Sequence, residues 1–271
     1  MGAASSAGRN APGQAPGAFL FDLDGTLYTD AGPLPGAVDA LAELRRRRIP
    51  FRCVTNTTRR SRRLLAERLA GYGFRIESAE IITAVMAGAA LLAGRGTRRV
   101  AAYVAAETTE DLSAFDLESS APETVLVGDL GDGWDFATLN RAFLQLMAGA
   151  DLLALQRDRY WLRGDGLALD AGPFVAALEY AAGKTATVCG KPSPAFYRTA
   201  LASLPAPLAA EPRRVVMVGD DLWGDVEGAQ RAGLASWMVR TGKFREDVVA
   251  ASGITPDRII DSVADVPRLL P

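Results

Sequence analysis

Acidic residues follow an apolar run near the start of the chain. The stretch "FDLDGTLYTD", residues 21–30, places Asp22, Asp24 and Asp30 directly behind the apolar residues 18–21. Converging carboxylates repel each other, and a charge is costly to hold away from water without a partner. A divalent cation resolves both problems, and Mg²⁺ takes a pair of carboxylates together with water and phosphate oxygens. Asp22 and the distant Asp220 could supply that pair, and the cation would draw a phosphate to the same place.

Other residue types in the chain could complete a phosphoryl transfer. One carboxylate, Asp22, can attack phosphorus, and a second, Asp24, can protonate the leaving group and later activate water. Residues two apart on a strand share a face, so both reach a phosphate if the chain turns at Gly25. A hydroxyl at Thr55 and an ammonium at Lys191 could bind the outer phosphate oxygens. Lysine is rare here, at three positions among 30 basic residues, which draws attention to Lys191.

Alternating strands and helices would position these side chains. The pattern predicts helices at 61–70, 196–204 and 223–233, another between Gly36 and Pro50, and a last one at the C-terminus. It predicts strands at 18–21, 51–56, 79–84, 185–189, 213–219, 234–240 and 258–262. This alternation indicates an α/β fold with a parallel sheet covered on both faces, and ligands of such sheets bind beyond the carboxyl ends of the strands. The candidate residues follow four predicted strand ends: Asp22/Asp24, Thr55/Asn56, Lys191 and Asp220/Asp221.

The middle of the chain predicts a separate domain. Strand-like pieces occur at "RRVAAYV", "ETVLVGD" and "ADLLALQ", and a helical pattern occurs at 136–150. We therefore expect an α+β domain at 84–183, inserted into a core made of 18–83 and 184–271. Residues 1–17, "MGAASSAGRNAPGQAPG", are small, polar and Gly/Pro-rich, which predicts a disordered leader.

Composition narrows the functional classes. The chain has no histidine, so mechanisms and metal sites that depend on histidine are excluded. The net charge of −2 argues against a general nucleic-acid binder, and the arginine runs at 45–48 and 59–63 are interpreted as solvated helix faces. No apolar stretch approaches the ~20 residues of a membrane span, and no secretory signal is evident. We expect a cytoplasmic protein without membrane partners, and leave a homodimer open.

Four motifs carry a resemblance to a known family. "DLDGTLY", "TNTT", "GKPSP" and "GDDLWGD", in this order, resemble those of the haloacid dehalogenase superfamily. The resemblance implies a Rossmann-like parallel-sheet core with an inserted cap domain, and Mg²⁺ as cofactor. It implies that Asp22 is the nucleophile and that Asp24 is the general acid and base. Thr55, Asn56 and Lys191 would bind the phosphate or the substrate. The metal ligands would be Asp22, Asp220 and the Asp24 carbonyl, and the supporting residues would be Gly25, Asp221 and Asp225.

The resemblance also indicates a subclass. An acid at Asp24 is typical of phosphatases and mutases in this superfamily. The interval from Asp22 to Thr55 is too short for a cap, whereas that from Thr55 to Lys191 is long enough, as in subclass IIA. The segments around 164–194 and 219–244 resemble the phospholysine phosphohistidine inorganic pyrophosphate phosphatases and their relatives. A phosphohydrolase acting on small phosphorylated substrates is therefore implied. Alternatives are a phosphatase for nucleotide or sugar monophosphates, or a phosphoryl-ligand binding protein without turnover.

The stretch "LQRDRYWLRGDG", residues 155–166, could select the substrate. Arg157 or Arg159 could hold a second anionic group, which pyrophosphate has and many monoesters lack. An ordinary solvated hairpin is the alternative interpretation.

Overall fold

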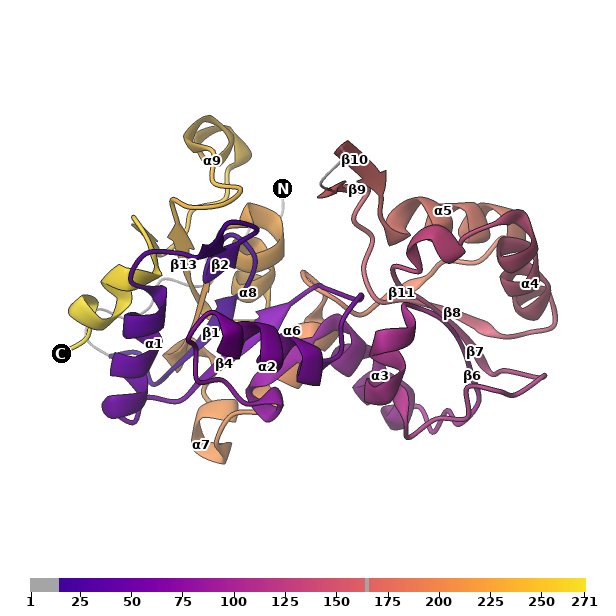
Figure 1. Cartoon of the computed structure of the whole chain (residues 1–271), viewed down its shortest axis with the longest axis horizontal. Coiled ribbons are helices and arrows are strands. Elements are labelled where there is room, and N and C mark those ends of the chain that lie inside the picture. Colours follow the sequence, from indigo (N-terminus) through magenta and orange to yellow (C-terminus); the bar gives the residue numbers. More distant parts are fainter. Residues whose placement is uncertain (1–14, 164–165) are drawn as a thin grey trace, which may run out of the picture. The chain divides into compact units, whose positions relative to one another are not determined.

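The chain folds into two compact units. The structure, a computed structural model, describes residues 15–163 and 166–271 (Figure 1). The core unit contains the described residues up to Thr55, together with Glu67–Ile81 and Tyr197–Pro271; the second unit contains Asn56–Ala66 and Ile82–Phe196. Most of the predicted leader, residues 1–14, lies outside the described residues. Gly17 is already tied to the core unit, because its N–H donates to the Arg214 carbonyl at 2.8 Å.

A six-stranded sheet organises the core unit (Figure 1). Its central strand β1 pairs in parallel with β4 on one side and with β12 on the other. The strands, in sheet order, are β14 (Arg258–Ile260), β13 (Ala235–Val239), β12 (Val215–Gly219), β1 (Ala18–Asp22), β4 (Phe51–Thr55) and β5 (Ile81–Thr83). The expected α/β fold with a parallel sheet is confirmed.

The sheet is covered on both faces. Every residue of β1, β12 and β13 is buried, and successive residues of a strand point to opposite faces. Phe19 lies 5.5 Å from Phe21 and 5.7 Å from Trp237, measured between ring centroids. The helices in or entering this unit are α1 (Ala37–Arg46), α2 (Arg62–Gly71), α6 (Pro194–Ala202), α7 (Ala206–Ala209), α8 (Gly228–Arg231) and α9 (Glu246–Ser252), and β2 (Tyr28–Thr29) and β3 (Gly32–Pro33) form a small hairpin.

The strand order reverses at β1. From β1 the chain continues to β4 on one side, and it later returns to β12 on the other side. At such a switch point the connections leave in opposite directions, which opens a crevice beyond the carboxyl ends of the two central strands. Asp22 is the last residue of β1, and Asp220 follows the last residue of β12. The topology alone therefore brings these two aspartates to the same edge.

The second unit has its own parallel sheet. Its strands, in sheet order, are β11 (Thr187–Val188), β8 (Asp151–Ala154), β7 (Thr124–Val127) and β6 (Val100–Tyr103). An antiparallel hairpin of β9 (Tyr160–Arg163) and β10 (Gly166–Leu169) and the helices α3 (Ala84–Gly94), α4 (Phe136–Met147) and α5 (Ala171–Ala182) complete it. Trp134 stacks between Tyr103 and Phe174. The strands and the helix predicted for the middle of the chain are all present.

Three predicted elements differ from the structure. The strand at 185–189 is short and pairs with β8 of the second unit, not with the core sheet where the sequence placed it. The helix predicted at 223–233 begins as a π-helical segment, Leu222–Glu227 (η5), before α8. The C-terminal helix is a 3₁₀ segment, Val263–Leu269 (η6), with Pro267 inside, where proline removes a backbone donor.

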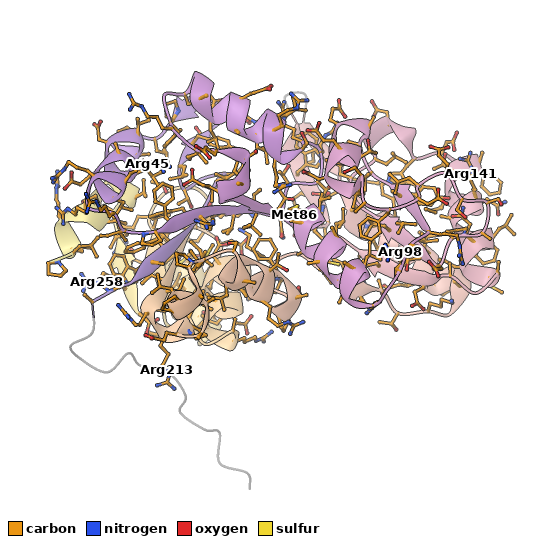
Figure 2. All side chains as sticks on the ribbon, turned by 90° about the horizontal axis from the view of Figure 1, so that it is seen from below. Arg45, Met86, Arg98, Arg141, Arg213 and Arg258 are labelled. Atoms are coloured by element: carbon orange, nitrogen blue, oxygen red, sulfur yellow. The ribbon has the colours of Figure 1, made fainter. Side chains whose placement is uncertain are left out.

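The arginines at 45–48 lie at the surface, as expected, whereas Arg59 and Arg62 of the second run are half-buried and form ion pairs with the buried side chains of Asp129 and Asp111. Arg45 pairs with Glu80 at 2.9 Å, and Arg46 and Arg47 share Glu43 at 2.6 Å. Figure 2 labels other exposed arginines, Arg98, Arg141, Arg213 and Arg258. None of the helices in the described ranges is long and apolar enough to cross a membrane.

Candidate active site

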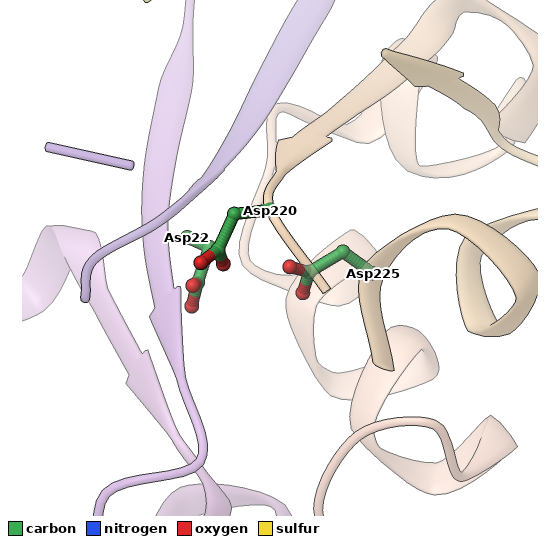
Figure 3. A group of neighbouring side chains, drawn as sticks. All are labelled: Asp22, Asp220 and Asp225. Atoms are coloured by element: carbon green, nitrogen blue, oxygen red, sulfur yellow. The ribbon is translucent and has the colours of Figure 1, made fainter. Parts of the chain in front are cut away.

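Three buried carboxylates converge at the switch point of the core sheet (Figure 3). Asp22 ends β1, Asp220 follows β12, and Asp225 lies in η5. One carboxylate oxygen from each residue lies within 4.8 Å of the others. The structure thus joins Asp22 and Asp220, as their strand-end positions predict, and adds Asp225, for which the resemblance implied only a supporting role.

The two oxygens of Asp220 have different surroundings. Oδ2 accepts a hydrogen bond from the Lys243 N–H at 2.7 Å. Oδ1 is buried, and no donor among the described residues reaches it. Burial, with the neighbouring charges of Asp22 and Asp225, raises the pKa of Asp220 to about 8. Folding therefore holds an unpaired carboxylate oxygen beside two further carboxylates, and the cluster must take up a proton or bind a cation to relieve the repulsion.

This donor set fits Mg²⁺. All three residues offer carboxylate oxygens, which are the hard ligands that Mg²⁺ prefers, and Oδ1 of Asp220 has no hydrogen-bond partner among the described residues. Asp225 is held in place because its Oδ2 accepts the Asp221 N–H at 3.0 Å. Asp221 itself caps the start of η5. Its Oδ1 accepts the N–H groups of Trp223 and Gly224 at the start of η5.

The loop after Asp22 turns sharply. The Gly25 N–H donates to the Tyr28 carbonyl at 2.8 Å, and Gly25 has φ of 81°, where residues with a Cβ are strained. A Cβ at Gly25 would lie 2.2 Å from Asp220 Oδ2. Glycine is therefore required here both for the turn and for the close approach of Asp220. Asp24, on this turn, is exposed, whereas Asp22 is buried.

Thr55 and Lys191 occupy buried positions in different units. Thr55 ends β4 in the core unit, and Lys191 lies in the second unit after β11. The side-chain amide of Asn56 pairs with the Lys191 main chain in both directions: Nδ2 donates to the Lys191 carbonyl at 3.0 Å, and Oδ1 accepts the Lys191 N–H at 2.7 Å. Asn56 thus fixes the backbone of Lys191. Its direct contact with a substrate stays a prediction.

Comparison with known proteins assigns the family. A haloacid dehalogenase-like hydrolase model matches residues 19–118, and a HAD-hydrolase-like model matches residues 188–266. The human haloacid dehalogenase-like hydrolase domain-containing protein 2 is 41% identical over 228 residues, which is 84% of this chain and 85% of that protein. The chain belongs to the haloacid dehalogenase-like hydrolases.

Two further relatives extend the similarity over nearly the whole chain. The human phospholysine phosphohistidine inorganic pyrophosphate phosphatase is 36% identical over 258 residues, which is 93% of both proteins. A glycerol phosphate phosphatase from Mycobacterium tuberculosis, solved in complex with calcium, is 30% identical with a TM-score of 0.82. The match covers 94% of this chain and 76% of that protein.

The arginines predicted to select the substrate of this hydrolase lie beside the hairpin of the second unit. Arg157 forms an ion pair with Glu179 of α5, at 2.8 Å between Nη2 and Oε2. Arg159 is exposed and immediately precedes β9. Arg157 is therefore already engaged within its own unit, and Arg159 is the stronger candidate for a substrate contact.

Sequence reasoning missed one segment of this hydrolase's site. Thr241–Lys243 follows β13, and it contacts both the Gly25 turn and Asp220. Two features of the sequence could have indicated this segment. Lys243 is one of only three lysines, and the segment lies at the carboxyl end of a core strand.

Proposed function

We propose that this haloacid dehalogenase-type phosphatase is a magnesium-dependent phosphohydrolase that forms a phosphorylated Asp22 during turnover. The observation that carries the proposal is the buried convergence of Asp22, Asp220 and Asp225 with an unpaired oxygen on Asp220. Asp22, Asp220 and the Asp24 carbonyl would hold the cation, with Asp225 in support. When bound, Mg²⁺ neutralises the carboxylates and stabilises the negative charge of the phosphoryl group.

The proposed reaction has two steps. In the first, a carboxylate oxygen of Asp22 attacks phosphorus, the bond from phosphorus to the leaving group breaks, and the protonated Asp24 gives its proton to the leaving atom. In the second, water attacks the phosphorus of phosphorylated Asp22 and gives a proton to the Asp24 carboxylate. The bond between phosphorus and Asp22 breaks, which releases phosphate and restores both residues. Thr55 and Lys191 donate hydrogen bonds to the outer phosphate oxygens.

The proposed substrates are phospholysine, phosphohistidine or inorganic pyrophosphate. The 36% identity over 93% of the named phosphatase supports this class. The similarity to a glycerol phosphate phosphatase supports small phosphate monoesters, including sugar and nucleotide monophosphates, as the alternative. We further propose that residues 84–183 act as a cap domain whose hairpin helps to select among them.

A panel of initial rates tests the proposal. Pyrophosphate, phospholysine, phosphohistidine and several monoesters are compared in Mg²⁺ and in excess chelator, with Asp22→Asn as the control. We expect hydrolysis only with Mg²⁺, and none by Asp22→Asn, because the amide keeps the volume of the side chain but is a poor nucleophile. Full activity in chelator would contradict the metal requirement. A near-native rate for a folded Asp22→Asn would contradict the nucleophile.

A further inference from the structure

A segment outside the four motifs contacts the candidate metal site. Residues Thr241–Lys243, the 241–243 segment, follow β13 (Ala235–Val239), the strand next to β12 in the core sheet. The segment therefore leaves the sheet at the same edge as Asp22 and Asp220. Its backbone and side chains reach both the turn after Asp22 and the two aspartates that follow β12.

The segment fixes the orientation of Asp220. The Lys243 N–H donates to Oδ2 at 2.7 Å. Two glycines enclose the same oxygen, since a Cβ would lie 1.9 Å from Oδ2 if built on Gly242 and 2.2 Å if built on Gly25. The carboxylate is thus held between two glycine backbones with Oδ2 occupied. Its other oxygen, Oδ1, is buried and has no donor among the described residues, so it is the Asp220 oxygen that is not already committed to a hydrogen bond.

The 241–243 segment also fixes the Gly25 turn and Asp221. The Thr241 hydroxyl donates to the Gly25 carbonyl at 2.6 Å, which ties down the turn that carries Asp24. The Lys243 ammonium pairs with Asp221 Oδ2 at 2.9 Å, and the other oxygen of Asp221 caps η5. One short segment therefore connects the turn after β1 to both aspartates after β12.

We propose that the 241–243 segment is a positioning element that aims Asp220 Oδ1 at the cation and holds the Gly25 turn in register with it. The inference rests on the proposed metal-dependent function, and it adds residues to the site that none of the four motifs contains. When a group that hydrogen-bonds to a metal ligand without contacting the metal is removed, metal affinity or activity commonly falls by about 10–100-fold. The segment should therefore control cation affinity without contacting the cation.

Binding of Mn²⁺ alone to the full chain tests this directly, measured by the electron paramagnetic resonance signal of the free ion. Gly242→Ala places a methyl group against Asp220, and we expect it to weaken Mn²⁺ binding by about 10–100-fold in dissociation constant. Gly253→Ala is the matched control. Gly253 has φ of 75° against 61° at Gly242, but no atom would lie within 4 Å of a Cβ at this position, so the variant tests the backbone strain alone. Gly253→Ala should bind Mn²⁺ like the native chain.

A second pair of variants keeps the test decisive if Gly242→Ala does not fold. Thr241→Val keeps the shape of the side chain but loses the hydroxyl that donates to Gly25, whereas Thr241→Ser keeps it. We expect weaker Mn²⁺ binding for Thr241→Val and recovery to within about threefold for Thr241→Ser, below the 10–100-fold effect of a lost outer partner. Unchanged affinity in Thr241→Val, or in a folded Gly242→Ala, would overturn the inference but leave the proposed function standing. A native chain that binds no Mn²⁺ would overturn both.

Discussion

Asp22, Asp220 and Asp225 form a cluster that folding alone does not favour. Main-chain N–H groups support two of these carboxylates, Asp220 through Lys243 and Asp225 through Asp221. Burial and mutual repulsion still raise the pKa of Asp220 to about 8. A buried acidic cluster that must take up a proton or a cation is typical of sites that bind or react, whereas packing alone favours apolar groups in the same place.

At the residue scale, the sequence predicted the reactive side chains better than the groups that orient them. Charged residues directly after buried apolar runs are visible in a sequence, so Asp22 and Asp220 could be selected. Backbone groups are the same at almost every residue, so the sequence does not show which of them will bind a side chain. The N–H of Lys243 that orients Asp220 could therefore not be predicted. The pairing of Arg157 with Glu179 could not be predicted either, because it depends on how α5 packs in the second unit.

The Asp170 carboxyl gives a pH prediction in the second unit. Asp170 caps α5 by accepting the Ala171 N–H at 2.7 Å and also accepts a hydrogen bond from Gln156. Burial, with a smaller contribution from Asp129, raises the pKa of Asp170 to about 6. The folded chain therefore keeps a proton on Asp170 between about pH 4 and 6, where the unfolded chain has lost it. Through this group, the free energy of unfolding should fall as the pH rises through that window.

Asp170→Asn should remove this dependence, because the amide oxygen still accepts both hydrogen bonds and does not titrate. The measurement is urea unfolding of both chains at pH 4 and pH 6.5. We expect the native chain to lose stability relative to Asp170→Asn at the higher pH. Parallel pH profiles for the two chains would show that Asp170 is not the titrating group.

At the element scale, local sequence patterns predicted most strands and helices. They did not predict which sheet a strand joins or which type of helix forms. The run "TATVC" is as apolar as the core strands, so its sequence does not say which sheet it joins. The pairing of Val188 with Ala154 places it in the second unit. In the same way, the helical spacing at 223–233 does not distinguish a π-helical turn from an α-helical one. The π turn matters because Asp225 lies in it and reaches back to the Asp221 N–H.

The β9–β10 hairpin has a defined anchor. The Arg59 guanidinium lies 5.2 Å from the centre of the Trp161 ring and forms an ion pair with the buried Asp129 at 3.2 Å. A stacked arginine that is also ion-paired holds the hairpin more firmly than either contact alone. Arg159, immediately before β9, is thus attached to a supported element.

Arg159→Ala should reduce pyrophosphate hydrolysis selectively. If Arg159 holds the second anionic group, its loss should lower kcat/KM for pyrophosphate by about 1.5–3 kcal/mol, as for a hydrogen bond to a charged group. Hydrolysis of p-nitrophenyl phosphate should change much less, because this ester lacks a second anionic group. Arg157→Ala is the matched control, and we expect a small effect on both substrates because Arg157 already pairs with Glu179. Equal losses on both substrates for Arg159→Ala, or no loss on either, would remove this arginine from substrate selection.

At the scale of the whole molecule, metal binding and folding should be coupled. In chelator at about pH 9, above the pKa of Asp220, Asp220→Asn removes one of three repelling carboxylates, so this variant should unfold at a higher temperature than the native chain. In Mg²⁺ the order should reverse, because a ligand that binds only the folded state stabilises it by about 2.7 kcal/mol at a hundred times its dissociation constant. Thermal unfolding of both chains in Mg²⁺ and in chelator makes the comparison. If Mg²⁺ stabilises both chains equally, Asp220 does not bind the cation.

Transfer of the phosphoryl group to Asp22 is the central step of the proposed mechanism. The direct measurement is rapid acid quench of Asp24→Asn with p-nitrophenyl phosphate, followed by mass spectrometry of the peptide that contains residue 22. The leaving group of this substrate needs little protonation, so the first step should proceed. The second step should slow by on the order of 10²–10⁴-fold without the general base. We predict a burst approaching about one phosphoryl group per chain, located on Asp22. Turnover by the native chain with no phosphorylated Asp22 in either protein would contradict the mechanism.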